Sequence, residues 1–238
     1  MSLVLPEHIG FIMDGNGRWA QGKGFPRKMG HEAGAKALEK IIDHCRTIGI
    51  QCATFYAFST ENWSRPKEEV DALMSLLDRY ITELHRKISS GEADVYKDVR
   101  IRFVGDLSVF SEERFTRIRE LEDLTDKPYS RLRINIAINY GGRNEIVSAV
   151  NRFIAENPGR PLTEKDISLR LYTEGCSDPD LIIRTAGEMR LSIFLIWQSA
   201  YAEYYSSPVY WTDFTPKELD IALEAFSKRT RKFGNVAK

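Results

Sequence analysis

The sequence predicts an α/β protein with a mainly parallel central sheet flanked by helices. Short apolar runs alternate with longer segments of helical periodicity along the whole chain, which is typical of strands joined by helical crossovers. The 238 residues are 42% hydrophobic, enough for one large core, and they contain no internal repeat or low-complexity linker. A single domain over residues 1–238 is therefore expected.

The first elements come from clear local patterns. The run "HIGFIMD" at 8–14 is typical of a buried strand. Residues 30–48 then place apolar side chains on one side of a helix, and "QCATFYAFS" at 51–59 predicts the second strand.

A strong helix is expected over residues 66–88. Pro66 suits its first turn, and Glu68 and Glu69 follow where carboxylates favour the positive end of the helix dipole. The simplest interpretation of its apolar stripe is core packing, and the alternative is the wall of a groove for an apolar substrate tail. The candidate wall residues are Leu73, Met74, Leu77 and Ile81.

The remaining elements follow the same alternation. Strands are expected at 99–106, 132–140 and 180–185, and helices at 111–124, 143–156, 163–172 and 215–231.

Composition excludes several classes of protein. Lysine plus arginine and aspartate plus glutamate number 34 each, so no global charge attracts nucleic acid and no nucleic-acid partner is expected. The three cysteines, Cys45, Cys52 and Cys176, form no C-x-x-C motif, which favours a reducing, cytoplasmic location. No apolar run approaches the roughly 18 residues that span a bilayer, and no signal-peptide pattern precedes the first strand.

Polar clusters follow four of the expected strands. Because ligands bind beyond the carboxyl ends of parallel strands, these clusters should meet on one rim of the sheet. They are Asp14 to Arg18, Ser59 to Arg65, Asn139 to Arg143, and Arg184 to Ser192.

The loop "DGNGRWA" at 14–20 has the spacing G-x-G-x-x-A, a weak form of the dinucleotide fingerprint. The acidic residue that such a site needs about 20 positions later is missing, and Arg18 and Trp19 are bulky. A P-loop would need Gly-Lys-Ser/Thr, and an aspartate-dependent phosphatase usually needs a carboxylate where Asn16 stands. The remaining interpretation is a phosphate-and-metal loop, with Asp14 as a hard oxygen ligand for Mg²⁺.

Five further polar residues strengthen this interpretation. One arginine at a strand end is commonly a surface residue, but several directed at one rim predict two phosphate groups or a pair of diphosphates. Diphosphate heads beside an apolar helix would fit prenyl chemistry. The residues are Arg27, His31, Arg65, Arg184 and Arg190.

Five segments resemble the cis-prenyltransferase family and above all the bacterial undecaprenyl diphosphate synthases, and the resemblance covers nearly the whole chain, from about His8 to Gly234. The segments are "HIGFIMDGNGRWA", "GHEAG", "YAFSTENWSRP", "INIAINYGGR" and "DLIIRTAGEMRLSIFLIWQSAYAEYY". The resemblance implies an apolar tunnel, a homodimer, Mg²⁺ and successive cis condensation of isopentenyl diphosphate onto an allylic prenyl diphosphate, farnesyl diphosphate in particular. It implies a long polyprenyl product, typically a carrier-lipid precursor for cell-wall glycans, released in transient contact with the inner face of the membrane.

The resemblance also implies residue roles. Asp14 matches a catalytic aspartate that binds magnesium, Asn62 a residue involved in proton removal, and Glu203 a carboxylate that helps to place the metal, often from the neighbouring subunit. The implied substrate-binding residues are Gly15, Asn16, Gly17, Arg18, Trp19, Arg27, His31, Ser59, Thr60, Glu61, Trp63, Arg65, Arg184, Arg190, Leu191 and Ser192.

Three positions depart from the family pattern: Ala186 replaces glycine or serine, Ile193 replaces asparagine, and Lys232 replaces arginine. Ala186 adds little bulk, and Ile193 removes a polar contact. Lys232 keeps the positive charge but lacks the forked N–H donors of an arginine. Two alternatives to an undecaprenyl enzyme are a synthase of shorter chains and a non-catalytic partner subunit. The partner is disfavoured because the loop aspartate and arginines are present.

Overall fold

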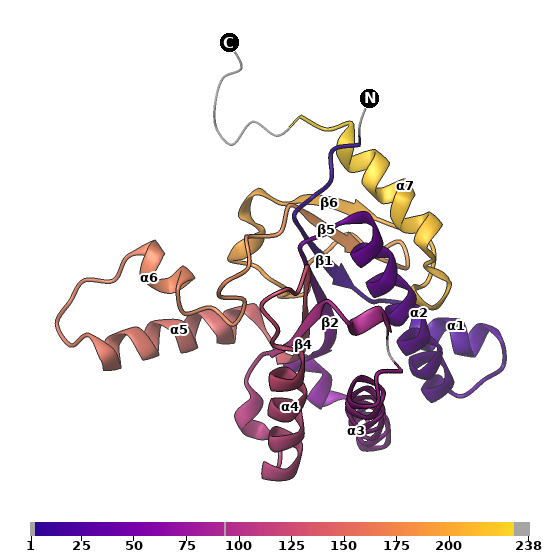
Figure 1. Cartoon of the computed structure of the whole chain (residues 1–238), viewed down its shortest axis with the longest axis horizontal. Coiled ribbons are helices and arrows are strands. Elements are labelled where there is room, and N and C mark those ends of the chain that lie inside the picture. The colour runs from indigo at the N-terminus through magenta and orange to yellow at the C-terminus, as the bar shows by residue number, and fades with distance from the viewer. Residues whose placement is uncertain (1–2, 93, 231–238) are drawn as a thin grey trace.

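The computed structural model describes residues 3–92 and 94–230, and its centre is a parallel sheet with helices around it (Figure 1). All five neighbouring strand pairs are parallel. The six strands lie in the order β3-β4-β2-β1-β5-β6. They are β1 (His8–Ile12), β2 (Cys52–Ser59), β3 (Val99–Val104), β4 (Leu132–Tyr140), β5 (Leu181–Arg184) and β6 (Glu203–Ser206).

Helices α1 to α6 occupy connections between strands, as the alternating pattern predicts, and α7 follows the last strand. They are α1 (Asn16–Gly22), α2 (Arg27–Ile48), α3 (Lys67–Ser89), α4 (Glu112–Thr125), α5 (Gly142–Glu156), α6 (Glu164–Ser168) and α7 (Pro216–Ser227). Among the described residues, no helix is both long enough and apolar enough to cross a bilayer.

The main core lies on one face of the sheet, under α2, α3, α4 and α7. Phe11 of β1 and Phe55 of β2 are both fully buried there and stack with ring centroids 4.7 Å apart. The opposite face is covered partly by the segment 191–195, which buries Phe194 against Tyr56. Truncating a buried Phe to Ala typically costs about 3–5 kcal/mol, so this core fixes the strands that carry the rim.

The expected α/β fold with a parallel sheet is confirmed, and each of the five expected strands forms. Two elements were not expected. Helix α1 begins directly after Gly15, whose φ of 103° only glycine adopts easily, so the glycine-rich loop passes at once into a helix. Strand β6 is a four-residue edge strand, too short for its alternation to be recognised.

Several boundaries were also wrong. The helix expected over 163–172 ends at Ser168, because the chain turns so that the backbone N–H of Tyr172 donates to Glu145 Oε1 at 2.7 Å. Helix α2 begins at Arg27 instead of residue 30. Helix α7 ends at Ser227, earlier than the expected 231, which lies outside the described residues.

Candidate functional site

Asp14 and Arg184 meet at the carboxyl ends of the neighbouring strands β1 and β5. Arg184 Nη2 donates to Asp14 Oδ2 at 2.7 Å, although the residues are 170 positions apart. Thr185 Oγ1 donates to the Asp14 carbonyl at 2.7 Å, and Trp211 N donates to the same oxygen at 2.9 Å. The backbone of Asp14 is therefore fixed, while its carboxylate remains one-third exposed and lines a polar pocket.

The loop after Asp14 is shaped by close packing. A side chain at Gly15 would meet the ring of Tyr210, and a Cβ at Gly17 would lie 2.7 Å from the guanidinium carbon of Arg27. Trp19 points its indole N–H at Asp213 Oδ1, 2.9 Å away. Gly17 thus lies beside the predicted phosphate-binding residue Arg27, and Asn16 packs against Gly30 and Gly34 of α2. Trp19 instead contacts the 3₁₀ turn η5 (Trp211–Asp213).

Glu69 gathers three of the predicted phosphate-binding residues. Its carboxylate lies 3.2 Å from Arg27 Nε, 3.0 Å from Arg65 Nη1 and 3.8 Å from His31 Nε2. Although partial burial opposes ionisation, the two arginines hold the pKa of Glu69 below its ordinary value. Burial lowers the pKa of His31 despite the nearby carboxylate, so this imidazole is neutral at pH 7.

The sequence analysis predicts only that Glu69 complements the dipole of α3. Its role as a shared partner was missed because Arg27 is 42 positions away. The available signal was the spacing of Arg65 and Glu69 at i and i+4. Arg65 and His31 line the polar pocket. Glu69 contacts both side chains but does not itself line the pocket.

A second carboxylate, Glu188, holds another pair of predicted residues. Arg18 Nη1 lies 3.3 Å from Glu188 Oε1, and Arg190 Nη1 donates to Glu188 Oε2. Arg184 donates to the Arg190 carbonyl and, at 3.0 Å, to Ser192 Oγ. Among the predicted arginines, Arg27 and Arg65 therefore share Glu69, and Arg18 and Arg190 share Glu188. Arg184 pairs with Asp14 and contacts the second group through the Arg190 carbonyl.

The segment after β2 closes one side of the pocket as a short 3₁₀ turn, Thr60–Ser64. Asn62 Oδ1 accepts from Ser59 N at 3.1 Å, which fixes its amide, and Glu61 and Asn62 both line the polar pocket. Trp63 Nε1 donates to Asn139 Oδ1 at 2.7 Å. Thr60 instead packs close to Gly141, and Leu191 lines a separate depression with Arg190.

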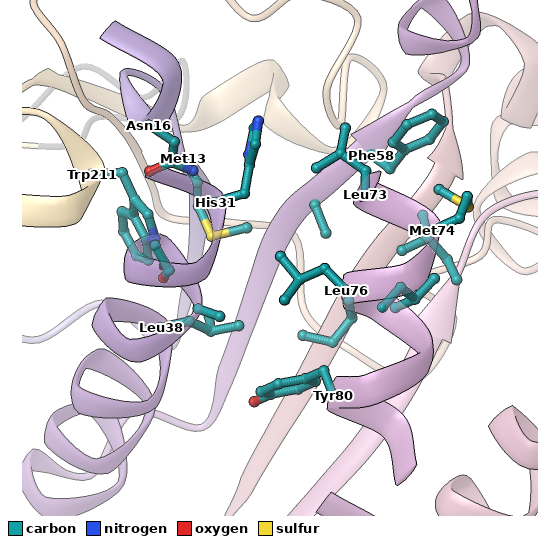
Figure 2. A pocket seen from close by; sticks show the side chains of 16 residues that line it. Met13, Asn16, His31, Leu38, Phe58, Leu73, Met74, Leu76, Tyr80 and Trp211 are labelled. Atoms are coloured by element: carbon teal, nitrogen blue, oxygen red, sulfur yellow. Dashed lines mark hydrogen bonds between the residues drawn. The ribbon is translucent and has the colours of Figure 1, made fainter. Parts of the chain in front are cut away.

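An apolar cavity continues from the polar pocket between α2 and α3 (Figure 2). The cavity together with its opening to solvent comprises about 730 Å³. Figure 2 shows Asn16 and His31 at one end and Tyr80 at the other. Leu73, Met74 and Leu77 line the cavity as expected, whereas Ile81 does not and is buried in the core.

The cavity and the polar pocket share part of their lining. Both are bordered by Asn16 and His31 together with Met13, Ala57 and Leu73. A molecule with a charged head and a long apolar tail would therefore find a continuous path from arginines to hydrocarbon.

Glu203 lies away from Asp14 within this chain. It pairs with Leu181 at the amino end of β5, whereas Arg184, the partner of Asp14, lies at the other end. Its carboxylate accepts from Arg229 Nη1 at 2.6 Å. Among the described residues no three His, Cys, Asp or Glu side chains form a metal cluster. A single carboxylate such as that of Asp14 is enough for Mg²⁺, which binds through one or two carboxylates plus substrate oxygens.

The departures from the family pattern fall on unusual backbone. Ala186 has a φ of 69° and Ile193 a φ of 58°, in the left-handed region that glycine and asparagine tolerate. The expectation that Ala186 matters only through bulk was incomplete, because its backbone carries the strain. The loss of a polar contact at Ile193 is likewise accompanied by strain. Lys232 lies outside the described residues.

The chain matches a family model described as "Putative undecaprenyl diphosphate synthase" over residues 12–234. It is 46% identical to an isoprenyl transferase from Aquifex aeolicus, with 99% of each chain covered. It is 44% identical to an isoprenyl transferase from Helicobacter pylori, with 97% of each chain covered.

Two solved structures share the fold. A lavandulyl diphosphate synthase from Lavandula x intermedia, in complex with dimethylallyl diphosphate, has a TM-score of 0.88 at 30% identity. A probable undecaprenyl diphosphate synthase from Campylobacter jejuni has a TM-score of 0.79 at 33% identity. Each match covers 97% of this chain and 99% of the other.

Proposed function

This chain belongs to the undecaprenyl diphosphate synthase family of isoprenyl transferases and is a prenyltransferase, and from that premise we propose its substrates and product. It condenses isopentenyl diphosphate repeatedly, with cis stereochemistry, onto farnesyl diphosphate. The observation that carries the proposal is the continuous path from the arginine-lined pocket into the apolar cavity.

The two arginine groups divide the diphosphates between them. His31 lines both the polar pocket and the apolar cavity, and Arg65 lines the polar pocket. Arg27 shares the Glu69 carboxylate with both, so these three residues bind the diphosphate of the allylic substrate whose tail enters the cavity. Arg184, Arg190 and Ser192 bind isopentenyl diphosphate. The forked N–H donors of the guanidinium groups suit the diphosphates of both substrates. Holding these diphosphates also orients the two carbons that react.

The reaction breaks the allylic C–O bond, forms a C–C bond and removes a proton from C2 of isopentenyl diphosphate. Arginines stabilise the charge that develops on the departing diphosphate. Asp14 would hold Mg²⁺, which when bound supplies further positive charge at the same group. Because Ser59 N donates to Asn62 Oδ1, Asn62 reaches the substrate through its NH₂ group. It therefore orients the diphosphate oxygen or water that takes the proton.

The product we propose is undecaprenyl diphosphate, used as a carrier-lipid precursor for cell-wall glycans. The named products of the two similar structures differ, so the fold alone does not fix chain length. A shorter cis-prenyl diphosphate is the second candidate. We further propose a cytoplasmic homodimer that contacts the membrane surface through its lipid product, with Glu203 acting near the metal of the neighbouring subunit.

Incubation with Mg²⁺, farnesyl diphosphate and labelled isopentenyl diphosphate, followed by product sizing, tests this proposal. A ladder that ends at the undecaprenyl length is expected. A product only one or a few units longer than the primer would replace the undecaprenyl assignment with the short-chain one. No incorporation by a folded protein would contradict the proposed activity and favour the partner-subunit alternative.

A further inference from the structure

Two cysteines lie together at the amino end of the sheet, the end opposite to Asp14. Cys52 is the first residue of β2 and is 4% exposed. Cys176 belongs to the turn before β5 and is only partly buried. The proposed reaction uses neither thiol.

The two sulfurs share a hydrogen-bond donor. Asn135 Nδ2 lies 3.5 Å from Cys52 Sγ and 3.4 Å from Cys176 Sγ, and the two thiols also hydrogen-bond to each other. Arg133 Nε donates to Asn135 Oδ1 at 3.0 Å, so the amide is oriented with its NH₂ toward the sulfurs. Because Asn135 is fully buried, this arrangement is fixed by the fold.

The surroundings give the two thiols different chemistry. The hydrogen bond from Cys52 outweighs burial and, with the charge of Arg133, lowers the pKa of Cys176. Burial raises the pKa of Cys52 above its ordinary value. Cys176, the less buried of the two, is thus the better nucleophile at neutral pH, and the buried Cys52 thiol lies beside it. Cys45, in contrast, is fully buried, which raises its pKa to about 12.

We propose that Cys52 and Cys176 form a reversible dithiol–disulfide pair that reacts with hydroperoxides. The Cys176 thiolate attacks a peroxide oxygen, the O–O bond breaks, and Cys176 sulfenic acid and hydroxide form. The Cys52 thiol then attacks the sulfenic sulfur, forming the S–S bond and releasing water. Two thiols are oxidised and one hydrogen peroxide is reduced to two waters.

The experiment treats reduced full-length protein with hydrogen peroxide, blocks the remaining thiols with N-ethylmaleimide and maps peptides without reductant. We expect a Cys52–Cys176 cross-link that dithiothreitol reverses, while Cys45 remains a thiol that is blocked only after unfolding. Cys176 should react at least about tenfold faster than Cys45, in keeping with its thiolate character. Equal reactivity of Cys176 and Cys45 would overturn the proposal, as would irreversible oxidation of Cys176 without a cross-link.

Three variants separate the roles of the thiols. Cys52→Ser should stop at the sulfenic acid, which dimedone traps at Cys176. Cys176→Ser should leave Cys52 unreactive, and loss of the Cys52 thiol at the wild-type rate would overturn the assignment. Cys45→Ser is the matched control and should form the cross-link as the wild type does. The mapping on wild-type protein decides the question even where a variant does not fold.

Discussion

Replacing Glu69 with Gln tests whether this carboxylate positions the arginines that we propose to bind the allylic diphosphate. The substitution keeps the size of the side chain and removes its charge. Arg27 and Arg65 would then lose the anion that holds them together, and their like charges would repel. Glu69 does not line the polar pocket, so its carboxylate does not compete with the substrate diphosphate for that space. We therefore expect that removing its charge weakens binding of the allylic diphosphate.

The size of the effect follows from the exposure of the two ion pairs. The side chains of Arg27 and Arg65 are 46% and 37% exposed, so solvent screens both contacts. Pairs of this kind contribute up to about 1 kcal/mol each. A combined loss of about 1–2 kcal/mol corresponds to a roughly 5- to 30-fold higher Kd for the allylic diphosphate.

The assay is calorimetric titration of the protein with farnesyl diphosphate, together with KM and kcat for both substrates. We expect KM for the allylic diphosphate to rise while kcat and KM for isopentenyl diphosphate change less than threefold, about 0.6 kcal/mol. Glu68→Gln, at an exposed neighbour in the same helical turn, is the matched control and should bind as the wild type does. Unchanged or tighter binding by Glu69→Gln would refute the positioning role.

Four further predictions concern other parts of the chain. Asp14→Asn should lower kcat about 10²- to 10³-fold with an unchanged circular dichroism spectrum, and retention of a tenth or more of the activity would contradict its role. Ile193→Asn should raise the free energy of unfolding by about 1 kcal/mol in urea titrations, because asparagine tolerates the φ of 58°; a lower melting temperature would count against strain there. Leu77→Trp, which narrows the apolar cavity, should shift the sized products to shorter chains, and unchanged products would place the growing chain elsewhere. Burial lowers the pKa of His8 to about 4, so the unfolded chain binds more protons between that pH and about 6.5. The free energy of unfolding should therefore fall by up to about 3 kcal/mol as the pH drops through this window, and an equal fall in His8→Gln would disprove the assignment.

The sheet could be predicted because most of its strands are apolar runs separated by segments of helical periodicity. Strands β1 and β2, which contain Phe11 and Phe55, are buried on both faces, so their apolar composition alone identifies them as strands. Strand β6 carries Glu203 and two tyrosines on an exposed edge, where no apolar alternation is required. Helix α1 begins with "NGRW", a glycine-rich sequence whose helix is stabilised by packing on α2 and not by propensity.

The rim of the sheet was also predictable, but its internal contacts were not. Strand ends place Asp14 and Arg184 on the same edge, as expected from a parallel sheet. Which arginine pairs with which carboxylate depends on contacts between distant segments, such as Glu69 with Arg27 and Glu188 with Arg18. No local spacing encodes these pairs.

The far end of the apolar cavity has a polar component that bears on how elongation stops. Tyr80 lines the cavity, and its hydroxyl lies 3.0 Å from that of the buried Tyr96. A growing hydrocarbon tail that pushes Tyr80 aside must separate this pair and leave a buried hydroxyl unsatisfied, at about 1–3 kcal/mol. The Tyr80–Tyr96 pair therefore opposes further elongation by a finite free energy and does not block it completely. Under the proposed activity, chain length would then be a distribution that broadens on warming, with each overlong product reporting one separation of this pair.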